Sequence, residues 1–170
     1  MALISPNLLK IRQNRTAKPL YARTQATPQA AFLAEDWDES VDIYPGSVLT
    51  SLGKGIVTLC DASATPAGLS GNFCAPKLGF NEVTNDYGRE ITLWVMTPAA
   101  QLEITAPAFD DAADWAGAEA DLEAMKAVFL KSNADGLLTI DGNAATPLSV
   151  AQLVSVEGTN QIIVSGLKNV

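Results

Sequence analysis

The sequence predicts an α+β domain that is mostly β: a compact β-sandwich or barrel-like domain with one helix and an extended N-terminal arm. Short runs of β-branched residues alternate with turn signals such as Pro45-Gly46 and Gly53-Lys54-Gly55, a spacing typical of all-β domains. Only one stretch has the period of a helix. With 170 residues, 48% of them hydrophobic, the chain can form one such domain and an arm.

Residues 1–34 form the predicted arm and residues 35–170 the single β-rich domain. The chain has 11 Lys and Arg against 19 Asp and Glu. Its first 25 residues hold no acid and five bases, so the rest has six bases, 19 acids and a net charge of −13. A basic arm on an acidic body predicts a tether that binds a negatively charged protein surface. The residues expected to make this contact are the apolar anchors Leu8, Leu9 and Ile11 and the bases Lys10, Arg12, Arg15, Lys18 and Arg23.

The expected strands are short and bounded by turn residues. A linker is expected at 24–30 and a long surface loop at 61–72, because both segments are rich in small and polar residues. The chain is expected to end in a β-hairpin at about 150–165 with a turn at 158–160. The other strands are expected at 41–44, 47–50, 56–60, 73–76, 90–96, 101–105 and 137–140.

The strand expected at 90–96 is apolar on both faces. Ile91, Leu93 and Val95 share one face, and Trp94 and Met96 lie on the other. Such a strand is buried twice, between two sheets or between a sheet and a partner subunit. We therefore expect the face of Trp94 and Met96 to meet another subunit or a larger partner.

One helix is expected at about 114–131. Leu122, Met125 and Phe129 recur at helical spacing. Asp114 is placed to cap the N-terminus, and Lys131 lies near the C-terminal end, where the helix dipole favours a base.

The composition argues against an enzyme and offers no cofactor or metal site. The chain has no His, the commonest general base and metal ligand. Cys60 and Cys74 are favoured as reduced buried thiols over a loop-closing disulfide, and two cysteines alone cannot make an ordinary zinc site. The acidic corner of Asp110, Asp111 and Asp114 is favoured as helix capping and solvation. Glycoside hydrolysis by its carboxylates is the enzymatic alternative.

The composition also limits the kinds of partner that the chain is expected to bind. The bases of the arm are too sparse, and the body too acidic, for nucleic acid. No apolar run approaches the roughly 20 residues that cross a membrane, and no secretory signal is evident, so synthesis in the host cytoplasm is expected. Nothing indicates a small-molecule substrate.

Six short motifs follow one another along the chain. They are Tyr44-Pro45-Gly46-Ser47-Val48-Leu49, Val57-Thr58-Leu59, Pro66-Ala67-Gly68-Leu69-Ser70, Ala75-Pro76-Lys77-Leu78-Gly79, Trp94-Val95 and Pro107-Ala108-Phe109-Asp110. In this order they resemble the head decoration proteins, or capsid cement proteins, of tailed bacteriophages. In that family a strand introduced by Pro-Gly and a Pro-x-Gly-Leu loop belong to a compact β-domain. The likeness covers roughly residues 44–110 and, more loosely, the region from 137.

The resemblance implies a structural virion protein that binds the outer surface of an assembled capsid and stabilises it. It implies the major capsid protein as partner, self-association as a homotrimer, and an arm that docks on the shell. The alternative is another virion component, such as a tail or fibre-base adhesion module. Such a module would bind a ligand through the 61–72 loop or the acidic corner.

Overall fold

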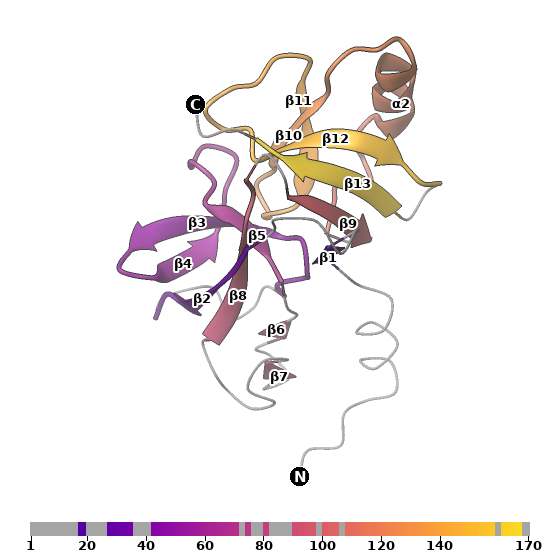
Figure 1. Ribbon diagram of the computed structural model, residues 1–170. Helices are drawn as coiled ribbons and strands as arrows, with labels where there is room; N and C mark the ends of the chain where they lie inside the picture. The colour runs from indigo at the N-terminus through magenta and orange to yellow at the C-terminus, as the bar shows by residue number, and fades with distance from the viewer. Residues whose placement is uncertain are drawn as a thin grey trace.

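The chain forms a closed five-stranded barrel next to a six-stranded antiparallel sheet, as seen in a computed structural model (Figure 1). The prediction of a mostly β fold is confirmed, and one helix occurs among the described residues. A two-stranded ribbon of β6 (Cys74–Ala75) and β7 (Phe80–Asn81) lies apart from both. The structure describes residues 17–19, 27–35, 42–71, 74–75, 80–81, 90–97, 100–105, 108–158 and 161–167.

The barrel closes in the order β2-β4-β3-β5-β8. Strand β2 pairs in parallel with β4 and antiparallel with β8, and the remaining pairs are antiparallel. The β3–β4 turn is Gly53-Lys54-Gly55, where all three residues have positive φ, so the glycines at its ends are needed. The barrel strands are β2 (Thr27–Leu33), β3 (Val48–Gly53), β4 (Ile56–Leu59), β5 (Gly68–Ser70) and β8 (Glu90–Val95).

The six-stranded sheet has the order β1-β9-β13-β12-β10-β11. The antiparallel pair of β12 and β13 confirms the terminal hairpin predicted from the sequence. The strands are β1 (Ala17–Pro19), β9 (Gln101–Thr105), β10 (Phe129–Ser132), β11 (Leu138–Gly142), β12 (Ala151–Val156) and β13 (Gln161–Gly166).

Strand β8 separates two hydrophobic cores. Ile91 and Leu93 point into the barrel core, while Met96 belongs to the core beneath the sheet and Trp94 packs against that core. Trp94 lies in register with Leu69 of β5, which is itself in register with Val48 of β3. The row of Val48, Leu69 and Trp94 on the outside of the barrel packs against the sheet. The two faces of β8 are therefore buried between two layers of the same chain.

The backbones of the two layers meet where β8 and β13 end. The Gly166 amide donates to the carbonyl oxygen of Ala100 at 2.8 Å. A Cβ atom on Gly166 would collide with the carbonyl oxygens of Met96 and Thr97. The backbones therefore touch at a point that leaves no room for a side chain.

The helix is shorter than predicted. Helix α2 is Trp115–Glu123, with Asp114 as the N-cap: its Oδ1 accepts from the Gly117 amide at 2.9 Å, as expected. The expected end at 131 is wrong, because the chain turns at Met125, which has a φ of 59°, and then enters β10. Phe129 pairs with Gln152 of the sheet, so tertiary strand pairing overrides helical spacing.

Three other expectations need correction, and a fourth concerns a segment that the structure describes only in part. Part of the expected linker and of the predicted arm is strand β2, and the expected 61–72 loop contains the fully buried strand β5. The strand expected at 41–44 is reduced to a single bridge residue, Ile43. Of the strand expected at 73–76, only Cys74–Ala75 belong to the described residues, where they form β6.

We predict that Gly166→Ala lowers the free energy of unfolding by about 1–3 kcal/mol, because the added methyl group must push β13 away from the end of β8. Urea denaturation measures the change. Ser165→Ala, on the preceding residue, serves as the control and is expected to change the stability by less than about 0.5 kcal/mol. Equal stability of Gly166→Ala and the wild type would contradict the close approach.

Candidate interaction surfaces

Most of the predicted contact residues of the arm lie outside the described residues: Leu8, Leu9, Lys10, Ile11, Arg12, Arg15 and Arg23. Lys18 is the exception. It lies in β1, where its backbone is in register with Glu103 of β9. The body thus holds the chain at Ala17–Pro19, and contact of the arm with a shell stays a prediction.

The predicted contact residues Trp94 and Met96 face the core beneath the sheet. Met96 is 7% exposed and Trp94 is half-buried. The indole Nε1 of Trp94 is buried and has no hydrogen-bond partner among the described residues. A Cβ atom on Gly71 would lie 2.7 Å from this nitrogen, so the glycine makes room for the ring. Contact of these two side chains with another subunit stays a prediction.

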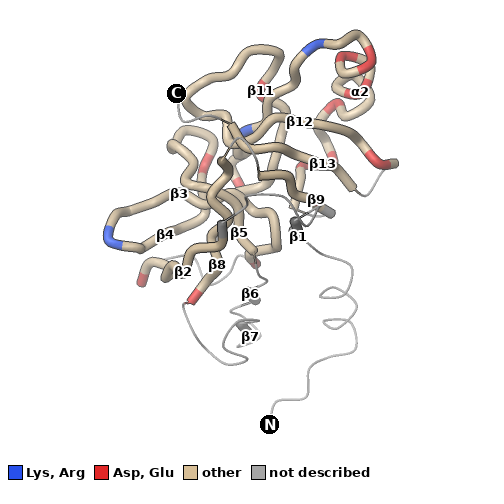
Figure 2. The backbone as a smooth tube through the Cα atoms, in the orientation of Figure 1, with Lys and Arg blue, Asp and Glu red and all other residues tan. Residues whose placement is uncertain are grey.

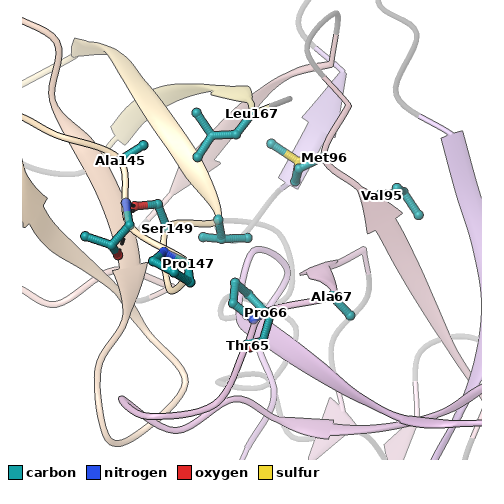
Figure 3. A pocket seen from close by; sticks show the side chains of 11 residues that line it. Thr65, Pro66, Ala67, Val95, Met96, Ala145, Pro147, Ser149 and Leu167 are labelled. Carbon is teal, nitrogen blue, oxygen red and sulfur yellow. Dashed lines mark hydrogen bonds between the residues drawn. The ribbon is translucent and has the colours of Figure 1, made fainter. Parts of the chain in front are cut away.

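A groove runs along Met96 where the barrel meets the sheet. It has a volume of about 460 Å³. Figure 3 shows Pro66, Pro147, Met96 and Leu167 around the same hollow. One wall is the 65–67 segment before β5, and the other is the 145–150 loop between β11 and β12. We call it the inter-sheet groove.

Asp141 holds the loop that forms the second wall. Its Oδ2 accepts hydrogen bonds from Ser149 Oγ at 2.6 Å and Thr146 Oγ1 at 2.7 Å, and its Oδ1 lies 3.1 Å from Lys131 Nζ. The side chain of Asp141 is only 4% exposed. Burial acts to raise the pKa of this carboxyl, but the hydrogen bonds from Ser149, Thr146 and Lys131, together with the charge of Lys131, lower it below its ordinary value.

Two carboxylates of the acidic corner, those of Asp110 and Asp114, accept hydrogen bonds from nearby backbone amides. Asp110 Oδ1 accepts from the Ala112 amide at 3.0 Å, and the Asp110 carbonyl oxygen accepts from Trp115 Nε1 at 2.6 Å. Asp114 caps α2. In the part of the chain that the structure describes, no three Cys, Asp or Glu side chains are grouped to hold a metal ion. The arrangement fits loop structuring and capping.

Cys60 is a free, buried thiol. Burial raises its pKa to about 11, against a lowering effect of Ser132 and a further raising effect of the Asp61 charge. Its Sγ lies 3.3 Å from each of the carbonyl oxygens of Asp61 and Ala64. For this residue the sequence preference for a reduced buried thiol is confirmed. The side chain of Cys74 lies outside the described residues.

Sequence reasoning missed an apolar surface at one end of the barrel. Phe32 is 46% exposed and Leu52 is 59% exposed. Phe32 is in register with Ile56, which is also in register with Gly53, the residue after Leu52. We call Phe32, Leu52 and Ile56 the barrel tip. No alternation of polar and apolar side chains along 27–33 indicated it, since residues 30–33 are all apolar.

The chain matches the model of a known protein family. Residues 4–169 match the model of a family described as phage cement protein. The match takes in the arm, the barrel and the six-stranded sheet. A comparison with individual curated proteins finds no match. None of the helices formed by the described residues has the length and apolar character to span a membrane.

We predict that Asp141→Asn lowers the free energy of unfolding at pH 7 by about 1–3 kcal/mol, since the amide is a poorer acceptor for Lys131, Thr146 and Ser149. Because the folded-state pKa of Asp141 lies below its ordinary value of 3.8, its carboxylate stabilises the fold above that value. This stabilisation is lost as the pH falls through the folded-state pKa.

The difference between wild type and variant should therefore shrink as the pH is lowered below about 4. Denaturant titrations at pH 7, 5 and 3 measure it, and other carboxylates cancel because both proteins carry them. Asp135→Asn, on an exposed turn, is the control and is expected to be neutral. A deficit of the same size at pH 7 and pH 3 would refute the assignment.

Proposed function

The chain belongs to the phage cement protein family, and we propose that it binds the outer surface of an assembled capsid and stabilises it. The observation that carries this proposal is the family match over residues 4–169, which makes the chain a structural protein of the phage virion. The major capsid protein is the proposed partner. The charge division within the chain supports attachment through the arm, because a base-rich segment with no acid precedes a body of net charge −13.

In this proposal the arm supplies both charged and apolar contacts. Lys10, Arg12, Arg15, Lys18 and Arg23 bind acidic groups of the shell, and Leu8, Leu9 and Ile11 are buried against it. Ordering an arm on binding has an entropic cost, so each contact is weak for its area. Many copies on one shell compensate because the linked contacts act together.

The body makes the remaining contacts. The barrel tip supports this part of the proposal, since its large apolar side chains lie on the surface, where they are best explained by a partner. Trp94 and Met96 border the boundary between barrel and sheet, and Met96 lines the inter-sheet groove, which is open to a second chain. A homotrimer would place three arms on neighbouring shell subunits.

Removal of residues 1–16 is predicted to weaken capsid binding at least about 10-fold, because it deletes three bases, each contributing about 0.5 kcal/mol as an ion pair, and three apolar anchors. The cut leaves β1 and the barrel strand β2 in place, so the body stays folded. Co-sedimentation with capsids that lack the protein measures binding. The double variant Gln13→Ala/Asn14→Ala is the control. If the truncated chain bound capsids with full affinity, the arm would have no part in attachment.

The isolated chain is predicted to sediment as a trimer at micromolar concentration. Sedimentation velocity and light scattering measure its mass. Leu52→Asp tests the role of the barrel tip, because a buried carboxylate without a partner would weaken an interface strongly. A monomer at all concentrations would contradict self-association in solution and leave capsid binding to be judged by co-sedimentation alone.

A further inference from the structure

A second hollow, of about 600 Å³, lies between α2 and the turn of the β12–β13 hairpin. Its floor is apolar and its rim is acidic, and we call it the acidic hollow. The apolar residues lining it are Phe109, Trp115, Val156 and Ile162, and the acids are Asp111, Asp114 and Glu119.

The rim carries negative charge that the described structure does not neutralise. Asp111 and Glu119 are exposed, and neither makes a hydrogen bond or ion pair through its carboxylate with another described residue. Asp114 caps α2. Figure 2 shows acidic residues gathered along α2 and at the end of β12. An apolar floor under unpaired carboxylates fits a segment that carries both apolar and basic side chains.

Such a segment occurs in this chain at residues 8–12, Leu-Leu-Lys-Ile-Arg. Its three aliphatic side chains suit the floor of the acidic hollow, and its two bases suit the carboxylates of Asp111 and Glu119. We propose that in the free protein residues 8–12 dock in the acidic hollow of their own chain.

The sheet register places Ala17, the first described residue of the arm, near this hollow. Ala17 is in register with Ile104 of β9, and Ile104 is in register with Ile162, which lines the hollow. Two strand spacings of about 4.8 Å separate Ala17 from Ile162, about 10 Å in all. Strands β1 and β13 run in the same direction, so the chain before Ala17 leaves the sheet at the end where the hollow lies.

The connection is also long enough. Arg12 is five residues before Ala17 and can reach about 17 Å from it at about 3.4 Å per residue. A short tether gives an effective concentration in the millimolar range, so even a weak contact is occupied within one chain. A shell that binds the arm more tightly would displace it. The inference concerns the free protein and stands whether or not the arm binds a shell.

The test is nuclear magnetic resonance of the full chain labelled with ¹⁵N. The reporters are the indole N–H of Trp115 and the amides of Ala116 and Gly158, which line the hollow. Removal of residues 1–16 is expected to shift all three signals. The double variants Asp111→Lys/Glu119→Lys and Lys10→Glu/Arg12→Glu should each reproduce much of the shift. Their combination reverses both members of each charge pair and should restore the wild-type signals at residues away from the substitutions. Glu123→Lys, on an exposed acid of α2 that does not line the hollow, is the control.

A peptide of residues 1–16, titrated into the chain that lacks them, measures the affinity directly. Glu119→Lys is expected to weaken binding about fivefold, because it removes one ion pair and puts a repulsion of similar size in its place, while Glu123→Lys leaves binding unchanged. The proposal would be overturned if truncation left the three reporter signals unchanged. It would also be overturned if Glu119→Lys and Glu123→Lys weakened peptide binding equally. If occupancy of the hollow rises with the concentration of the full chain, the arm binds the hollow of a second copy, and the intramolecular contact is refuted.

Discussion

The structure depends on β8 having two apolar faces that serve two different cores. The barrel core takes Ile91 and Leu93, and the core beneath the sheet takes Trp94 and Met96. Since side chains alternate along a strand, a shift of one residue would exchange the two sets and spoil both cores at once. The backbone contact of Gly166 with the residues that follow β8 then fixes how the sheet lies on the barrel.

This arrangement also distributes charge. Helix α2 and its acids lie beside the six-stranded sheet (Figures 1 and 2), whereas the exposed apolar side chains of the barrel tip belong to the other layer of the molecule. The chain therefore presents two unlike surfaces, one acidic and one apolar. If the arm and the barrel tip both bind the shell as proposed, this division keeps the two contacts from competing for the same area of the molecule.

The sequence was sufficient for the fold class, the β8 strand, the terminal hairpin and the Asp114 cap, because each depends on local alternation, turn residues or capping. It was insufficient for β2, where Pro28 and small residues suggest a linker. Proline is tolerated there because β2 at that point pairs with β8 alone. The helix end and β5 were also missed, since pairing with distant strands decides both. The barrel tip and the acidic hollow form only when separate strands are brought together, so no local pattern could reveal them.

The two proposed destinations of the arm impose a condition on its energetics. If residues 8–12 bind their own body in the free protein, the net free energy of arm binding to the shell is only the difference between the two contacts. A weak internal contact is then an advantage, because it covers three aliphatic side chains in the free protein and yields to a shell on which many arms bind together. The acidic hollow meets this condition: its unpaired carboxylates are exposed to water, where ion pairs are worth little, and only its floor is apolar. A deeper, fully buried charge pair at the same place would hold the arm too firmly for it to leave.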